Sequence, residues 1–409
     1  MVLRLPLAAV LVVGNTALGE KSTAPAARTE FEYDGDFLTN LSGGLEKGSG
    51  YDGYLKLGET IGFGSWQDPD DKDNYKREFA IHASVIYPHG EEFSQKYVGD
   101  VNGVSNLYVS PSLRLFSLWV EGNFIQYSLS VRCGIWALDK ANGFWQSDAA
   151  GVFLNGGFGT FPVISNGLVA AVYPVSSPCV RVDWAPLDKQ PLTLRAAVFS
   201  GDVGTPAENP HNTKWDLPSA EGASFFVEAI YKLKSAHGDP VGTYRIGGYY
   251  DTMHFDDLNG GNSHLGNQGL YAVVDQYIQP LIDGAPSGLV AFAKVAGAPG
   301  DRNLVNFSAE VGLSQTALFF KKEGREDVIA IGAGFLNVSD EARDSSGNAY
   351  PTHNETVIEL TYQAHLTDLE RGNDFTVLLQ PDFQYIINPG AVHGQPNALV
   401  AGLRFTVKY

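Results

Sequence analysis

The 409-residue chain has few cysteines, few basic residues and no apolar run long enough to span a bilayer as a helix. Its two cysteines, Cys133 and Cys179, are too few for a disulfide-stapled scaffold, and their positions in the sequence leave open whether they pair. Only 28 Lys and Arg residues stand against 46 Asp and Glu, which gives a net charge of −18. Without a basic stretch to neutralise phosphates, no nucleic acid is expected as a partner.

The N-terminus has the pattern of a secretory signal peptide. Arg4 gives a positive start, residues 5–13 form a short apolar core, and Ala17-Leu18-Gly19 supplies the small residues that signal peptidase requires. The predicted signal covers residues 1–19, and residues 20–409 are the exported protein. No linker rich in Pro, Ser or Gly divides that part into separate domains.

The last eleven residues predict a strand with one apolar and one polar face. Leu399, Leu403, Phe405 and Tyr409 fall on one face of it, whereas Arg404 and its polar neighbours fall on the other. A period of two that ends in an aromatic residue is typical of a strand with one face toward lipid. An ordinary C-terminal strand of a soluble β-sandwich is the alternative.

Segments with the same alternation recur along the chain. Residues 79–87, 192–198 and 225–233 are clear examples, and 46 glycines supply turns between such segments. We count about sixteen, most of them near the nine to eleven residues that a tilted strand needs to cross hydrocarbon. The fold class predicted is therefore all-β: a transmembrane antiparallel up-and-down β-barrel of about 16 strands.

The connections between these segments alternate between short and long. Residues 186–190 and 235–240 are short, as periplasmic turns are, whereas residues 89–111 and 139–177 are long, as outer loops are. A soluble protein built of repeated blades is the competing interpretation, but it requires self-similarity at a fixed period, and we find none.

Several segments carry charged residues on the face opposite to the apolar one. Facing lipid, each would cost a few kcal/mol, so these residues are expected to face a wet lumen. The candidates for the pore lining are Arg132, Arg181, Asp183, Arg195, Glu228, Arg245 and Asp275.

Residues 139–177 predict a loop that folds into the barrel and narrows it. Phe158, Phe161 and their aromatic neighbours make this segment too apolar for a freely solvated loop. Aromatic rings stack on the C–H faces of sugars while charged groups bind the hydroxyls, so a sugar-binding constriction is one interpretation. A loop that only packs on the rim is the other.

No catalytic or cofactor site is expected. The histidines have no nucleophile at motif spacing, there is no Gly-x-Ser-x-Gly elbow, and no His/Cys cluster has the spacing of metal ligands. Gly332-Ala333-Gly334 lies inside a strand pattern and therefore does not open a dinucleotide-binding helix.

The long loop and the segments around it contain several distinctive motifs, which include Leu154-Asn155-Gly156-Gly157-Phe158-Gly159, Tyr173-Pro174-Val175, Tyr271-Ala272-Val273-Val274-Asp275-Gln276 and Gln380-Pro381-Asp382. In these motifs the chain resembles the OprB family of carbohydrate-selective porins. The likeness covers most of the mature chain, and it adds Asn155, Phe158 and Phe161 to the candidates for the pore lining. Leu168, Cys179 and Ala391 depart from the family pattern, which bears on the shape of the constriction and on the preferred sugar.

The resemblance implies a bacterial outer-membrane channel through which small sugars such as glucose diffuse passively past a narrow, arginine-bearing constriction. It implies no cofactor and no enzymatic activity, with sugars and outer-membrane lipid as partners. A homo-oligomer, with a trimer as one arrangement, is expected for a barrel of this size. A general or anion-selective porin, an outer-membrane enzyme such as a lipase, and a soluble secreted binding protein are the alternatives.

Overall fold

The computed structural model describes residues 26–64, 66–68, 71–76, 78–107, 109–124, 128–139, 143–168, 171–186, 191–201, 204, 207–215, 222–279, 288–319, 326–345, 353–367 and 375–409. The predicted signal peptide, residues 1–19, lies outside this part of the chain.

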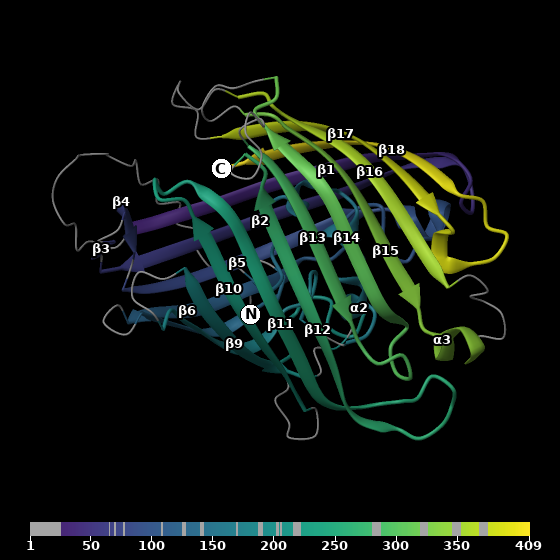
Figure 1. Cartoon of the computed structure of the whole chain (residues 1–409), viewed down its shortest axis with the longest axis horizontal. Helices are drawn as coiled ribbons and strands as arrows, with labels where there is room; N and C mark the ends of the chain where they lie inside the picture. Colours follow the sequence, from purple (N-terminus) through teal and green to yellow (C-terminus); the bar gives the residue numbers. More distant parts are fainter. Residues whose placement is uncertain are drawn as a thin grey trace, which may run out of the picture.

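Sixteen strands form one closed antiparallel barrel, and each pairs with its neighbours in sequence except where the ends of the sheet meet (Figure 1). The first strand, β1, pairs with the last, β18, so that Glu32 lies opposite Lys408. The barrel strands are β1 (Ala26–Ser42), β2 (Gly48–Phe63), β5 (Phe79–Gly90), β6 (Arg114–Phe124), β7 (Leu129–Trp136), β8 (Ser177–Trp184), β9 (Leu192–Ser200), β10 (Ala223–Lys234), β11 (Pro240–Phe255), β12 (His264–Tyr277), β13 (Leu289–Gly297), β14 (Val305–Thr316), β15 (Val328–Val338), β16 (Asn354–His365), β17 (Thr376–Ile387) and β18 (Ala398–Lys408). This confirms the predicted fold class.

The strands are more uneven in length than the sequence predicted. They range from eight residues in β7 to 17 in β1, because long strands such as β1 and β11 continue past the band that hydrocarbon can cover. The connection between β2 and β5, which is long for a turn, contains a separate two-stranded hairpin of β3 (Trp66–Asp68) and β4 (Asp71–Lys76). This hairpin and the C-terminus lie at the same end of the barrel, here named the turn end (Figure 1).

The outer surface of the barrel is apolar, as alternation predicts. Ile246 and Leu270 are 66% and 74% exposed, and Leu403, Phe405 and Tyr409 of the terminal strand also point outward. Exposed aromatic side chains gather near both ends of the strands, as they do in the interfacial girdles of membrane barrels. Those near the turn end include Phe63, Phe79, Phe124, Trp184, Tyr231, Phe375 and Tyr409, and those near the opposite, loop end include Phe37, Tyr87, Tyr250, Phe307 and Tyr385.

Segment 113–124 is apolar on both faces in the sequence, and the structure explains why. The register between β5 and β6 shifts next to Ser84, where Ser84 pairs with Ser117 and Val85 pairs with Leu115. Beyond this bulge Leu118 and Val120 face outward while Trp119 faces inward.

Within the described residues no helix is long and apolar enough to cross a membrane. Both cysteines are free thiols: Cys133 is exposed on β7, and Cys179 is buried on β8.

Candidate functional site

Two long connections at the loop end lie inside the barrel and fill much of its lumen. We name residues 91–113, between β5 and β6, loop A, and residues 137–176, between β7 and β8, loop B. Loop A contains the π-helical turn η1 (Ser94–Val98), and loop B contains η3 (Ala150–Val152), α1 (Gly156–Gly159) and α2 (Pro162–Ser165). Figure 1 shows α2 within the ring of strands. The inward position of loop A was not predicted, since residues 89–111 were interpreted as an ordinary outer loop.

The turns of loop B follow from its local sequence. The side chain of Asn155 accepts a hydrogen bond from the amide of Gly157 (3.0 Å) and so caps the N-terminus of α1. Pro162 occupies the first turn of α2, where its fixed φ suits a helix and its missing N–H leaves no unpaired donor. These caps let very short helices persist within the lumen.

Loop B is held against the far wall of the barrel by buried polar side chains. The carboxylate of Glu359 on β16 accepts hydrogen bonds from the amides of Leu154 (2.6 Å) and Asn155 (3.1 Å). Lys294 on β13 donates to the carbonyl of Phe158 (2.6 Å), at the end of α1. Charge-assisted bonds of this kind are stronger than neutral ones, so the wall fixes the backbone of loop B directly.

Loop A is held by the same face of β16. Glu355 precedes Glu359 by four residues on this strand. Its carboxylate accepts hydrogen bonds from the amides of Val101 (2.8 Å) and Asn102 (3.2 Å). It also accepts from the amide of Gly390 (2.6 Å), in the connection between β17 and β18. Residues four apart in a strand share a face, so one row of carboxylates serves both loops.

The two loops also bind each other. The amide of Asn106 donates to the carbonyl of Leu154 (2.8 Å), and the amide of Gly156 donates to the carbonyl of Gly103 (2.9 Å). The side chain of Asn106 adds a bond to the carbonyl of Phe153 (3.3 Å). Loops A and B therefore form one hydrogen-bonded unit inside the barrel.

Three of the predicted pore arginines lie on neighbouring strands and point inward, but they are buried against the wall. Arg132 pairs with Glu121 (2.7 Å), Arg181 pairs with Asp183 (3.2 Å), and Arg195 binds both carboxylate oxygens of Asp183 (2.7 and 3.0 Å). Arg195 also donates to the carbonyl of Gly143 in loop B (2.6 Å). We name Arg132, Arg181 and Arg195 the arginine wall.

Two of the other predicted charged residues hold loop B, from β10 and β12. Glu228 accepts from the amide of Trp145 (3.3 Å) and lies 3.4 Å from Arg245. Asp275 accepts from the hydroxyl of Ser147 (2.5 Å) and from the amide of Asp148 (3.1 Å). Glu228 and Asp275 therefore position the loop, and Arg245 pairs with Glu228.

The two rings predicted to form an aromatic stacking surface are buried in the structure. Phe158 and Phe161 are 1% and 0% exposed. Phe158 stacks on Phe153 at 4.3 Å between ring centroids, and Phe161 packs against Tyr271 at 5.6 Å. These rings form a small apolar core between loop B and the barrel wall. In a wide lumen, such a core helps to hold the loop in place. Phe158 is nevertheless among the residues that border a cavity within the inner loops, whereas Phe161 is not.

Two cavities flank the inner loops. The larger, about 590 Å³, opens toward the turn end, and the smaller, about 340 Å³, lies among the residues of loops A and B. Asn106, Gly151 and Tyr173 line both cavities, so we name these three residues the neck. The hydroxyl of Tyr173 donates to the carbonyl of Leu107 (2.6 Å), and burial raises the pKa of this hydroxyl well above its usual value. It is therefore neutral, and because its proton is given to Leu107 its oxygen is left as an acceptor at the neck.

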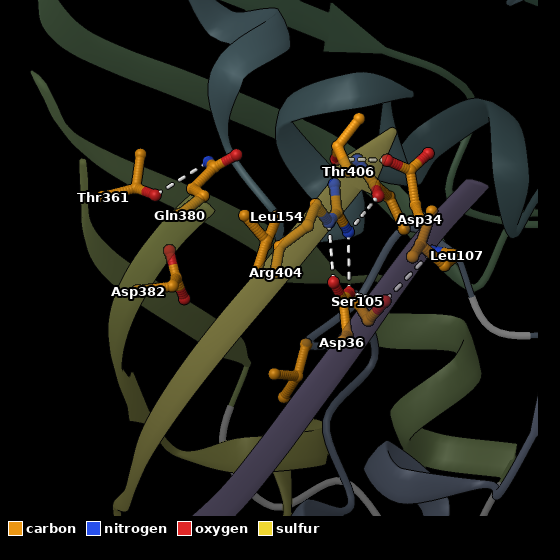
Figure 2. Close-up of polar contacts among 12 residues, drawn as sticks. Asp34, Asp36, Ser105, Leu107, Leu154, Thr361, Gln380, Asp382, Arg404 and Thr406 are labelled. Carbon is orange, nitrogen blue, oxygen red and sulfur yellow. Dashed lines mark hydrogen bonds and ion pairs between the residues drawn. The ribbon is translucent and has the colours of Figure 1, made fainter. Parts of the chain in front are cut away.

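A charged cluster lies on the first and last strands, with Ser105 of loop A beside it (Figure 2). Arg404 binds both oxygens of Asp36 at 2.7 Å each and donates to the side-chain oxygen of Asn106 (2.9 Å). The hydroxyl of Ser105 donates to the same carboxylate (2.7 Å). Thr406 donates in turn to Asp34. The cluster therefore connects the two strands that close the barrel, β1 and β18, with loop A.

Sequence analysis missed Arg404, Asn106 and Tyr173 as site residues. Arg404 lies on the predicted lumen face of the terminal strand, and Tyr173 begins the motif Tyr173-Pro174-Val175 shared with the porin family, so signals for these two were present. The meeting of all three residues was not foreseeable, since they come from three distant parts of the chain. Among the described residues no group of three His, Cys, Asp or Glu side chains is placed to hold a metal.

Comparison with known proteins agrees with this architecture. The family model for the carbohydrate-selective porin, OprB family, matches residues 75–409. Porin B of Pseudomonas aeruginosa is 24% identical over 417 residues, covering 92% of this chain and 86% of that protein.

Solved structures show the same fold. OprB of Pseudomonas putida superposes with a TM-score of 0.76 at 22% identity, covering 94% of each chain. The outer membrane channel DcaP of Acinetobacter baumannii gives a TM-score of 0.54 at 13% identity, covering 96% of this chain and 99% of that one. The chain therefore belongs to the OprB family of carbohydrate-selective porins, which are β-barrel channels of the bacterial outer membrane.

Proposed function

We propose that small sugars such as glucose cross this barrel by passive diffusion, moving from the loop-end cavity through the neck into the turn-end cavity. The observation that carries the proposal is that Asn106, Gly151 and Tyr173 border both cavities. A pyranose needs hydrogen-bond partners for hydroxyls on several sides, and the neck offers an amide, a backbone segment and a phenol. Passage requires weak binding, because a tightly held solute would not leave.

The turn-end cavity supports this route with further neutral and paired groups. Gln363 and Gln380 line it, as do Arg404 and Lys56. Lys56 lies 2.8 Å from Glu30, and Arg404 binds Asp36, so each cation has a counter-charge close by. Sugar hydroxyls can donate to the carboxylates and accept from the cations, and such a lining suits a neutral polyol.

The pairing of charges also bears on the alternative of an anion-selective porin. Anion attraction requires cations whose charge is not cancelled locally. The arginine wall lies beside Glu121 and Asp183, and its members are between 4% and 8% exposed. We assign these arginines, together with Glu228, Arg245 and Asp275, to holding the lumen in shape behind the neck. Asn155, Phe158 and Phe161 have the same role within loop B.

Swelling of liposomes that contain the purified porin tests the proposal. We expect glucose to enter faster than a disaccharide, and faster than an amino acid of similar size. Equal passage of amino acids and sugars would instead support a general porin. A larger conductance for small anions than for small cations, together with slow sugar entry, would support an anion-selective channel.

Assembly into a homo-oligomer, with a trimer as one arrangement, remains a prediction from the size of the barrel. Mass measurement of the protein in detergent, with the detergent contribution subtracted, distinguishes a monomer from a trimer.

A further inference from the structure

Gln384 lies on the inner face of β17, wholly buried, at the point where loops A and B meet. Its side-chain oxygen accepts from the side-chain amide of Asn155 in loop B (3.0 Å). Its side-chain nitrogen donates to the carbonyl of Val104 in loop A (2.8 Å) and to Asp382 (3.0 Å). One side chain of the wall therefore contacts both loops.

We infer that Gln384 is a positioning residue that sets the width of the neck, and hence the largest sugar the channel admits, by fastening loops A and B to β17 together. The inference rests on the proposed function, because it concerns what passes between the two cavities. Gln384 lines neither cavity and does not touch the solute.

The path from Gln384 to the neck is short on both sides. Val104 is two residues before Asn106, whose amide bonds to Leu154, the residue next to Asn155. Gln384 thus holds the backbone on either side of the bond that joins the loops at the neck. Asp382 orients the amide of Gln384, and Glu359 holds the amides of Leu154 and Asn155 from the neighbouring strand.

Both the oxygen and the nitrogen of the Gln384 side-chain amide have hydrogen-bond partners. A primary amide has an acceptor oxygen and two donor hydrogens, and here it accepts from loop B while donating to loop A and to β17. A leucine of similar size would fill the same volume but make none of these bonds. The two loops would then be held to the wall only by their other anchors, and the neck would widen or fluctuate.

The test is the size limit of the channel in Gln384→Leu. Proteins in liposomes are compared for entry of glucose, maltose and raffinose. We expect the rate of maltose entry relative to glucose to rise about fivefold or more, while glucose entry changes less than about twofold. A loss of overall stability alone would lower all rates together, so the ratio separates positioning from a merely structural role.

Two further variants sharpen the result. Asn155→Ser keeps a side-chain oxygen able to cap α1 but is too short to reach Gln384, so it should shift the ratio in the same direction by a smaller factor. Gln276→Leu is the matched control: this glutamine of β12 donates to the carbonyls of Val241 and Tyr277 and to neither loop. It should leave the ratio unchanged.

A folded Gln384→Leu protein, verified by heat-modifiable migration, with the wild-type maltose-to-glucose ratio would overturn the inference. If that variant does not fold, Asn155→Ser decides, and an unchanged ratio there has the same meaning. If the wild type admits no sugar at all, the proposed function fails. The inference about width is then tested by single-channel conductance in salt, which it predicts to be larger in Gln384→Leu than in the wild type.

Discussion

Two parts of the inner wall carry similar polar side chains but use them differently. On β7, β8 and β9 the arginine wall satisfies its charges mainly with the carboxylates of Glu121 on β6 and Asp183 on β8. On β16 and β17, Glu355, Glu359 and Gln384 satisfy theirs with the backbone and side chains of loops A and B. The first region therefore stabilises the barrel itself, whereas the second region shapes the passage. Charge on a lumen face does not by itself mark a solute site.

The largest effect is expected from a change at Arg404, because this side chain both stabilises the barrel and contacts a residue of the neck. Its bidentate pair with Asp36 joins β18 to β1, and its bond to Asn106 reaches the neck. Arg404→Met leaves a buried carboxylate without its cation, which we expect to lower the free energy of unfolding by about 3–5 kcal/mol. Urea titration of the protein in lipid bilayers measures it.

The double variant Asp36→Leu with Arg404→Met removes both charges and serves as control. It should recover most of the lost stability, because no unpaired charge remains. An Arg404→Met protein as stable as the wild type would show that this pair does not link closure to the neck.

Glu359→Ala should have the next largest effect, this time on permeation. The change deprives the amides of Leu154 and Asn155 of their acceptor, and each orphaned buried donor costs about 1–3 kcal/mol. Loop B should detach locally, so entry of disaccharides into liposomes should rise several-fold. Glu359→Gln retains one acceptor oxygen and should lie between the wild type and Glu359→Ala. Unchanged exclusion of disaccharides in Glu359→Ala would contradict the role given to β16.

Arg132→Met tests the other side of the comparison. Because Arg132 is buried beside Glu121 and lines neither cavity, we expect glucose entry to stay within about twofold of the wild type, with lower thermal stability. Swelling rates and the temperature at which the folded band disappears on a denaturing gel provide the two readouts. A severe loss of glucose entry with normal stability would instead indicate that the arginine wall contacts the solute.

The smallest effect concerns Asp100 in loop A. Burial raises the pKa of this carboxyl to about 6, above its value in an unfolded chain. Ionisation of Asp100 therefore opposes folding as pH rises from about 4 through 6, and below that range the carboxyl is protonated in both states. Asp100→Asn should raise the free energy of unfolding by up to about 3 kcal/mol at pH 7.5 and by almost nothing at pH 4. An equal gain at both pH values would exclude ionisation as its cause.

Much of the barrel was predictable because alternation is a local property. The outward face of β18, the inward face of β8 and the all-β class all follow from a period of two. The roles of Phe158 and Phe161 were not predictable in this way, since a ring buried against a wall and a ring exposed to a sugar have the same local sequence. Loop A was interpreted as an outer loop because of its length. Its polar and small residues fit water as well as they fit a row of buried carboxylates, so the sequence did not correct that interpretation.

By itself, the sequence determined which side chains face hydrocarbon and which face the interior, because successive residues of a strand point to opposite sides. Only the tertiary structure decided how the interior is used. Glu355 meets Val101 across 254 residues of sequence, and Gln384 meets Val104 across 280. These partners meet because the sheet closes and because buried polar groups need hydrogen-bond partners. Neither condition can be inferred from one segment of the sequence.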